Sequence, residues 1–279
     1  FHQKNASDLR AKKFAEHKDY LEIIKSNSGR FKIENVSFNS GYSDFGTSVF
    51  ENKLIFASAR DTGNFSQRRH KWTGEYYTNI YSANIDPQNS AAVKPDKFKT
   101  ALNTKFHEST PVFTKDGRTM YFTRNNFLNG KRGRDENKVT LLKLYKANLI
   151  EGEWKNIEAL PFNSDQYSVA HPTLSVDEKT LYFASDMPGT LGQSDLFKVT
   201  INEDGTFGKP QNLGTAINTE GRETFPFISE DNELYFATDG LPGLGSLDIF
   251  VVKINLDTKE AISAVRNIGA PINSQYDDF

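Results

Sequence analysis

Leu181-Tyr182-Phe183-Ala184-Ser185-Asp186 and Leu234-Tyr235-Phe236-Ala237-Thr238-Asp239 are the two stretches of sequence that decide the fold. Each joins an apolar, aromatic run to a small polar tail, a pattern typical of a strand that is buried on both faces. Related runs contain Phe56 and Phe122. The four central phenylalanines, Phe56, Phe122, Phe183 and Phe236, are 66, 61 and 53 residues apart, so the chain consists of repeats of about this length.

Each repeat has the pattern of a four-stranded antiparallel sheet. Pro111-Val112-Phe113 and the turn Lys115-Asp116-Gly117 precede one buried run, which predicts a β-hairpin. An alternating third strand and a weaker fourth strand follow. A single small sheet cannot bury both of its faces, so neighbouring sheets must stack, and radial closure protects their edges. We therefore predict an all-β fold, a β-propeller of four-stranded blades. A solenoid is the alternative, but its repeats are usually shorter.

Every repeat opens on an asparagine followed by serine or threonine, with an acid five residues after the asparagine. The pairs are Asn39 with Asp44, Asn103 with Glu108, Asn218 with Glu223 and Asn273 with Asp278, while the variant at Asn163 has Val169 or Ala170 instead of the acid. The opening at Asn273 starts a fifth unit. We therefore expect a propeller over residues 29–279 that is truncated in its last blade, with four complete blades here, the start of another, and five in the parent protein.

Residues 1–28 depart from the strand pattern. Apolar residues between Ala6 and Lys25 recur near helical spacing among charged residues, which predicts a short amphipathic helix as a lead-in to the propeller. The segment Gly29 to Val36 matches the fourth-strand segment Gly152 to Leu160. We expect it to pair into the last blade and to close the ring.

Composition excludes several classes of protein. The 279 residues contain 34 lysines and arginines against 36 aspartates and glutamates, a net charge of −2, which argues against a nucleic-acid binder held by bulk electrostatics. No apolar run is long enough for a membrane-spanning helix. The absence of cysteine excludes disulfides, thiolate nucleophiles and cysteine metal sites.

The hairpin Thr180 to Gly189 and the loop Gly192 to Phe197 resemble the repeat of the TolB-type periplasmic propellers. A narrower resemblance rests on Tyr42-Ser43-Asp44-Phe45-Gly46, on Phe56 to Gly63 and on Ile272 to Phe279. These segments are similar to the OmpA-family envelope proteins of Bacteroidetes, including the PorE-like components associated with the type IX secretion system.

The second resemblance implies a location and a role. In that family a tetratricopeptide-like helical segment precedes the propeller, and a peptidoglycan-binding OmpA domain follows it, so residues 1–28 would be the end of the helical segment. It implies a periplasmic, outer-membrane-associated protein that links a secretion or gliding complex to the cell wall. The propeller would bind a protein partner, an outer-membrane or periplasmic component of that complex, and no nucleic acid.

No catalytic constellation is found in the sequence. The chain lacks a Gly-x-Ser-x-Gly elbow, a His-Glu-x-x-His motif and a Walker-type loop, so we predict no catalytic residue, no metal, no cofactor and no enzymatic activity. His107 and His171 occupy corresponding repeat openings, but a metal site needs three or four converging ligands. Hydrogen-bonded histidines at the start of a strand are the favoured interpretation.

Acids recur at one phase of the repeat. We predict that they lie at the mouth of the propeller channel, at the start of the inner strands: Asp44, Glu108, Glu223 and Asp278. Such a carboxylate ring would bind a cation or a basic peptide. The competing interpretation is that the acids accept N–H groups of the turns or pair with neighbouring basic residues.

The loop between the second and third strands is 9 to 11 residues longer in the first two repeats than in the last two. Both extensions are basic, and long loops on a rigid scaffold often carry binding sites. The predicted partner-binding residues are Arg68, Arg69, His70, Lys71, Trp72, Tyr76, Lys131, Arg132 and Arg134. Solvated loops without a partner are the alternative. Rival functions are a glycan-binding propeller, with Trp72, Tyr76 and Tyr77 stacked on sugar rings, and the accessory propeller of a periplasmic hydrolase.

Overall fold

The structure is a computed structural model that describes residues 9–16, 18–60, 69–70, 73–84, 94–98 and 102–279. The chain divides into two compact units. We call residues 35–172 the blade 1–2 unit, and residues 1–34 with 173–279 the blade 3–4 unit. In the described part of the chain neither helix is long and apolar enough to cross a membrane.

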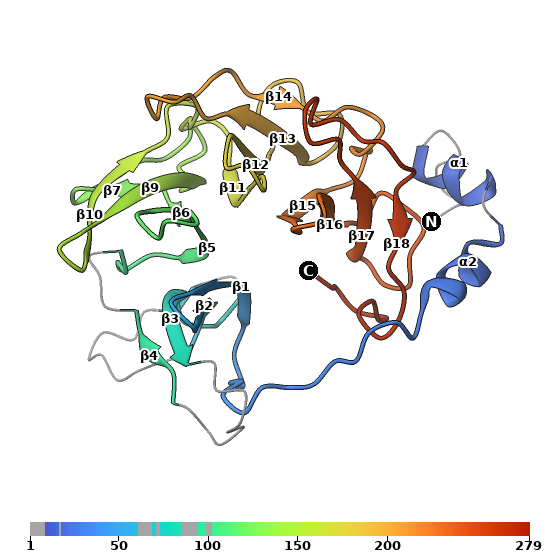
Figure 1. Cartoon of the computed structure of the whole chain (residues 1–279), viewed down its shortest axis with the longest axis horizontal. Helices are drawn as coiled ribbons and strands as arrows, with labels where there is room; N and C mark the ends of the chain where they lie inside the picture. The colour runs from blue at the N-terminus through green and yellow to red at the C-terminus, as the bar shows by residue number, and fades with distance from the viewer. Residues whose placement is uncertain (1–8, 17, 61–68, 71–72, 85–93, 99–101) are drawn as a thin grey trace. The chain divides into compact units, whose positions relative to one another are not determined.

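The blade 1–2 unit contains two four-stranded antiparallel sheets (Figure 1). Blade 1 consists of β1 (Asp44–Phe50), β2 (Lys53–Ser58), β3 (Asn79–Asn84) and β4 (Asp96–Lys97). Blade 2 consists of β5 (Glu108–Phe113), β6 (Thr119–Asn125), β9 (Leu142–Ile150) and β10 (Glu153–Ala159). A small ribbon of β7 (Phe127–Leu128) and β8 (Lys131–Arg132) lies between β6 and β9 in the sequence, within the loop expected to be extended.

The remaining two sheets have the same order of strands. Blade 3 consists of β11 (Val169–Leu174), β12 (Thr180–Ser185), β13 (Asp195–Thr200) and β14 (Gln211–Asn212). Blade 4 consists of β15 (Glu223–Ile228), β16 (Glu233–Thr238), β17 (Asp248–Lys253) and β18 (Arg266–Asn267). Four sheets of four antiparallel strands confirm the predicted all-β, propeller-type fold with four complete blades.

The N-terminal region differs from the expectation of a single helix. Two helices are present, α1 (Leu9–Glu16) and α2 (Tyr20–Asn27), with Ile24 of α2 buried. After α2, the Gly29 N–H donates to the Ala270 carbonyl over 2.7 Å. The segment that follows, up to Val36, is not a strand, because no described strand pairs with its backbone. The domain boundary at residue 28 stays a prediction.

Each unit has its own aromatic core. The largest fully buried side chains include Tyr81, Tyr145, Tyr182, Phe122, Phe183 and Phe236, all on second or third strands. Stacked or tilted rings face each other across these strands, as in Phe122 with Tyr145 at 5.8 Å and Phe183 with Phe197 at 6.0 Å. The high aromatic content therefore fills the core, where such rings supply large buried areas.

The first strand of each blade has one residue in the left-handed conformation: Gly46, Thr110, His171 and Phe225, with φ between 45° and 64°. The strand register shifts at this point in β1, β5 and β15, which marks a β-bulge. Gly46 also lies so close to β5 that an added Cβ would be 2.7 Å from Thr110 Cγ2. Glycine is therefore required at position 46, whereas Thr110 is held in a strained conformation.

Candidate functional site

The asparagines that open the second and later repeats are structural residues. Asn103 Oδ1 accepts the Ile80 N–H over 2.8 Å, and its Nδ2 donates to the Ile80 carbonyl over 3.1 Å. The same pair of bonds joins Asn163 to Leu144, Asn218 to Leu196, and Asn273 to Ile249. The amide side chain thus pairs with the third strand of the preceding blade as another strand would, and it places the turn that follows.

The turn that follows each asparagine, which we call the entry turn, is stabilised by the acid wherever one recurs five residues after the asparagine. Thr104 donates its N–H and its hydroxyl to the Glu108 carboxylate over 3.1 and 2.6 Å. The equivalent bonds join Ser40 to Asp44, Thr219 to Glu223, and Ser274 to Asp278. Glu108 and Glu223 are fully buried, so they are not accessible to a cation or peptide from solvent. Asp44 and Asp278 are partly exposed.

In blades 1 and 2 an arginine forms an ion pair with the acid of the entry turn. Arg60 Nη2 lies 2.8 Å from Asp44, and Arg124 Nε lies 3.2 Å from Glu108. Burial raises the pKa of Glu108 to about 7, although Arg124 opposes the shift. Burial alone would also raise the pKa of Asp44, but hydrogen bonds from Ser58, Arg60 and Ser40 keep it below its ordinary value.

Of the predicted partner-binding residues, Arg68, Lys71 and Trp72 lie outside the described residues. Arg69 is exposed and its guanidinium lies 4.8 Å from the centroid of the Tyr76 ring. It also donates to the Gly74 carbonyl over 3.1 Å and to the Tyr76 hydroxyl over 3.3 Å. Lys131 and Arg132 lie on β8, and Arg134 follows it, all exposed.

The entry turn of blade 2 connects the two extensions. The ring of His70, from the first extension, lies 5.1 Å from the ring of His107, and Phe106 lies 5.0 Å from Phe127. Arg132, from the second extension, lies 5.2 Å from the Phe106 ring. The repeat pattern and the loop lengths do not predict Phe106 as a residue of the site. Phe106 stands between Lys105 and His107, directly after the opening Asn103-Thr104, and its sequence context is that of a structural repeat.

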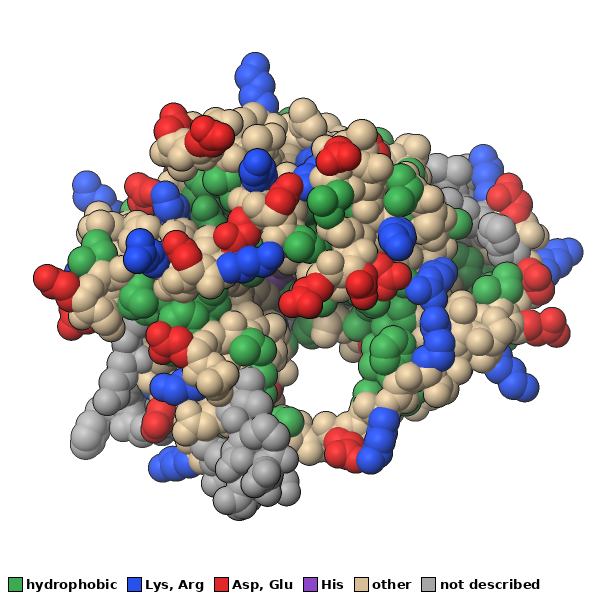
Figure 2. Space-filling model, viewed as in Figure 1, with side chains coloured by type: hydrophobic (Ala, Val, Ile, Leu, Met, Phe, Trp, Pro, Cys, Tyr) green, Lys and Arg blue, Asp and Glu red, His purple; other side chains and the backbone are tan. Residues whose placement is uncertain are grey.

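Lys105 completes a set of exposed cations over aromatic rings. Its Nζ lies 5.7 Å from the Phe106 centroid and 5.4 Å from the Phe127 centroid. We define the basic-aromatic surface as Arg69, His70, Tyr76, Lys105, Phe106, Phe127, Lys131, Arg132 and Arg134. None of its lysines or arginines forms an ion pair with another described residue. On the molecular face shown in Figure 2, basic and acidic side chains are interspersed.

His107 is neutral near pH 7. Burial, with a smaller effect from the charge of His70, lowers the pKa of His107 to about 4. Its Nδ1 accepts the Thr78 N–H over 3.1 Å, so a proton on the neutral ring sits on Nε2. Among the described residues no group of three or more His, Asp or Glu side chains is arranged to hold a metal ion.

The short loops of blades 3 and 4 are capped by aspartate. The Asp195 carboxylate accepts the N–H groups of Leu191 and Gly192 over 2.8 and 3.2 Å. Asp248 accepts those of Leu244 and Gly245 over 2.6 and 2.8 Å. Both aspartates are buried. They fix the loop backbone ahead of the third strand and do not form a solvent-facing site.

No protein-family model matches the chain, and no curated protein matches its sequence. Among solved structures, the chain is similar to a putative TolB from Agrobacterium tumefaciens, at 15% identity and TM-score 0.49 over 90% of this chain and 69% of that one. It is also similar to TolB from Acinetobacter baumannii (16%, TM-score 0.42, 77% and 40%) and to a thermostable family-43 glycoside hydrolase (11%, TM-score 0.48, 79% and 74%).

A further similar structure is a puromycin-hydrolysing peptidase from Mycobacterium tuberculosis, at 14% identity and TM-score 0.45 over 84% of this chain and 31% of that one. The chain spans less than half the length of the first solved structures that it matches. At these identities the likenesses concern the fold alone. They include both TolB proteins and hydrolases, so they assign no activity to this chain.

Proposed function

We propose that this chain is a non-catalytic propeller that binds a protein partner on its basic-aromatic surface. One observation carries the proposal: Arg69, Lys105 and Arg132 are exposed cations placed over aromatic rings, with no acidic partner among the described residues. Arginine and aromatic residues together are typical of the anchors of protein interfaces. The rings also restrain the cations before binding, which lowers the entropy lost when a partner docks.

The charge of the surface determines what it selects. Unpaired cations favour a partner that presents carboxylates, because charge complementarity raises the association rate and excludes basic partners. The resemblance of Tyr42 to Gly46, Phe56 to Gly63 and Ile272 to Phe279 to the Bacteroidetes OmpA family supports a periplasmic location. We propose that the whole protein links an outer-membrane secretion or gliding complex to peptidoglycan, which it binds through a domain outside this chain.

The aromatic contacts disfavour glycan binding as the main function. Sugar rings stack on exposed aromatic faces, but Arg69 lies over the Tyr76 ring. Tyr77 packs at 4.6 Å against His107 and edge-to-face at 6.2 Å against Phe106. Calorimetry with peptidoglycan fragments tests this alternative, and measurable heat that is lost on replacing Tyr76 would support it. An accessory role beside a hydrolase domain is tested by searching the parent gene for such a domain.

The test of the proposed function is a charge reversal with a matched control. The triple variant Arg69→Glu, Arg132→Glu and Arg134→Glu changes only exposed side chains of the surface. The control variant Lys179→Glu, Lys209→Glu and Lys253→Glu makes the same change of charge on exposed residues of the blade 3–4 unit. Partners are cross-linked in cells that produce the full-length protein, purified and identified by mass spectrometry.

We expect the surface variant to lose a partner that the wild type and the control variant retain, while all three proteins melt alike. Binding of fluorescein-labelled tetraglutamate should fall in parallel, because its carboxylates require the same cations. Retention of every partner by the surface variant would refute the proposal.

A further inference from the structure

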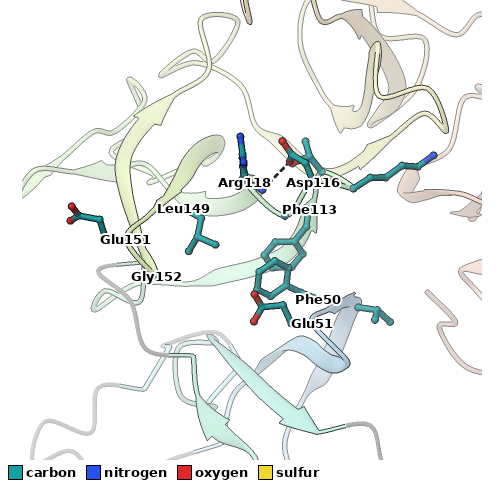
Figure 3. Close-up of a pocket in the computed structure, with 12 residues that line it drawn as sticks. Phe50, Glu51, Phe113, Asp116, Arg118, Leu149, Glu151 and Gly152 are labelled. Atoms are coloured by element: carbon teal, nitrogen blue, oxygen red, sulfur yellow. Dashed lines mark hydrogen bonds between the residues drawn. The ribbon is translucent and has the colours of Figure 1, made fainter.

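A groove lies between the hairpin turns of blades 1 and 2, on residues that the proposed function does not use. It encloses about 650 Å³ and is lined by the turn after β1, the turn between β5 and β6, and the turn between β9 and β10. Figure 3 shows the rings of Phe50 and Phe113 side by side, with Glu51 next to Phe50 and Glu151 at the other end.

The floor of the groove is aromatic. The Phe50 and Phe113 rings stack with centroids 4.5 Å apart, and Trp154 contacts them at 5.8 and 5.5 Å. Trp154 is buried, whereas Val49 on the edge of the groove is 62% exposed. The floor is therefore rigid and apolar, and it is partly open to solvent.

In the blade 3–4 unit the corresponding position is occupied by lysine. Lys259, in the loop between β17 and β18, pairs with Asp177 in the β11–β12 turn over 2.7 Å, and its side chain is only 13% exposed. Lys198 supports the same loop by donating to the carbonyls of Thr258 and Lys259 over 3.3 and 3.0 Å. It also pairs with Glu260 over 2.6 Å. A basic side chain of the chain itself thus fills this inter-blade position.

The lengths of two turns account for the difference. Residues 254–265 connect β17 to β18, and this loop is long enough to cover the position between the hairpin turns. In blade 2 only Glu151 and Gly152, both at positive φ, connect β9 to β10. This two-residue turn cannot reach across to blade 1, so the equivalent position in the blade 1–2 unit remains an open groove.

We propose that the groove binds an extended segment of a partner protein that carries lysine or arginine, with the cation in the role that Lys259 has in blades 3 and 4. Glu51 takes the role of Asp177: it is an exposed acid of the first hairpin turn and has no ion-pair partner among the described residues. The Phe50 and Phe113 rings add a face for cation–π contact.

The other acids of the groove differ in availability. The Asp116 carboxylate already accepts the Thr114 hydroxyl over 2.6 Å and the Arg118 N–H over 2.9 Å. Glu151 forms an exposed ion pair with Lys155 at 3.3 Å, which an incoming cation can replace at little cost. Lys115 and Arg118 also line the groove, and the charge of Arg118 acts on Asp116, so Asp116 contributes little attraction for a cation. Glu51 is therefore the main determinant of selectivity, and the site is independent of the basic-aromatic surface and of its acidic partner.

The experiment measures tetralysine binding by fluorescence anisotropy at near-physiological salt. The groove variant is Glu51→Lys, and the matched control is Glu203→Lys, an exposed acid in the β13–β14 turn. We expect Glu51→Lys to weaken binding by about ten-fold or more and Glu203→Lys to leave it unchanged, because short-range charge complementarity determines the affinity. Equal binding by wild type and Glu51→Lys would overturn the proposal.

Fluorine NMR locates the ligand. A protein labelled with 5-fluorotryptophan gives one signal each for Trp72 and Trp154, and Trp72→Phe assigns them. Tetralysine should shift the Trp154 signal, because Trp154 lies directly behind the groove floor, and tetraglutamate should not. A Trp154 signal unmoved by tetralysine, or moved equally by tetraglutamate, would refute the groove site. Neither result bears on the basic-aromatic surface, which the partner cross-linking tests separately.

Discussion

The blade 1–2 unit and the blade 3–4 unit each bury an apolar core between their two sheets, but near the hairpin turns the sheets of each unit meet through different chemistry. In the blade 1–2 unit the contact between sheets is aromatic, through Phe50, Phe113 and Trp154. In the blade 3–4 unit two lysines join the sheets, Lys198 to Glu260 and Lys259 to Asp177. The first arrangement leaves a groove between the hairpin turns, and in the second the side chain of Lys259 fills the corresponding position.

The difference extends to the second strand. Arg124 of β6 lies opposite Glu108 in the register of blade 2, and Thr238 of β16 lies opposite Glu223 in blade 4. The Thr238 hydroxyl donates to Glu223 over 2.6 Å, so a neutral group does there what the guanidinium does in blade 2. This repeat position can therefore hold either an arginine or a threonine, provided that the side chain donates a hydrogen bond to, or pairs with, the buried acid.

The largest expected change in stability distinguishes the arginine donor of blade 2 from the threonine donor of blade 4. Arg124→Ala leaves the buried Glu108 side chain without its cation and should lower the free energy of unfolding by about 3–5 kcal/mol. Thr238→Val removes one hydrogen bond to Glu223, which keeps those from Thr219, and should cost about 1–2 kcal/mol. Urea denaturation measures both. The double variant Arg124→Met and Glu108→Gln should recover much of the loss, and equal effects of the two single changes would contradict this comparison.

The second prediction concerns pH. The folded pKa of His107, about 4, lies below its unfolded value near 6.5, so the unfolded chain binds the proton more tightly between these values. Stability should therefore fall as pH drops from 6.5 to 4, by up to about 3 kcal/mol from this residue. The raised pKa of Glu108 acts in the opposite direction, because its stabilising contribution is lost as pH rises from 4.5 to 7.

The difference between wild type and His107→Asn in urea denaturation at pH 4.5 and 6.5 isolates the histidine. In blade 4 the same repeat position holds Arg222, paired with Asp239 at 3.0 Å, so this position has no histidine there. His107→Asn should therefore lose stability less steeply on acidification than wild type. Identical pH profiles would exclude His107 as a source of the pH dependence.

The third prediction compares the start of the third strand. Asp248→Ala removes the acceptor of two loop N–H groups and of the Asn267 amide, all in a buried setting, and should cost about 2 kcal/mol. The blade 2 residue at this position, Lys143, pairs with Asp165, which is 53% exposed. Lys143→Ala should therefore cost less than about 1 kcal/mol. Thermal denaturation of the two variants measures the difference in stability. A larger loss of stability for Lys143→Ala would contradict the larger stabilising role assigned to Asp248.

The smallest expected effect tests the lysine closure of blades 3 and 4. Lys198→Met should cost about 1 kcal/mol, because it removes an ion pair to a mostly exposed glutamate together with two carbonyl contacts. Lys146 has the same register in blade 2 and pairs with Glu158 at 3.5 Å. Lys146→Met should change the free energy of unfolding by at most about 0.5 kcal/mol. Equal losses of stability in the two variants, measured by urea denaturation, would show that the contacts of Lys198 stabilise the protein no more than the surface ion pair of Lys146.

Much of the fold follows from local sequence. Alternation and turn residues predict the hairpins, and the repeat spacing predicts the number of blades, because each strand buries its own aromatic residues. The repeat pattern predicts that the entry asparagines share one role, but their bonds to Ile80 and its equivalents connect residues 19 to 24 positions apart. Such pairing depends on the completed turn, and residue type alone does not reveal it.

The candidate site was predictable in part. The loop lengths and basic residues identified Arg69, His70 and Arg132, which the structure connects through Phe106 and His107. Those two residues belong to an entry turn, whose sequence resembles a structural repeat and gives no sign of a neighbouring loop. The left-handed conformation of Thr110 could likewise not be predicted from the sequence, because β-branched residues rarely adopt a positive φ.

The asparagine pairs have a consequence for how this propeller can be recombined. Each blade is completed only when the next asparagine bonds to its third strand, so the boundary between adjacent sheets does not divide the chain into self-sufficient parts. A cassette that keeps both halves of this bond begins just after one asparagine and ends on the next. Segments 40–103, 104–163, 164–218 and 219–273 are therefore the natural modules for duplication or exchange in building chimeric propellers from this chain.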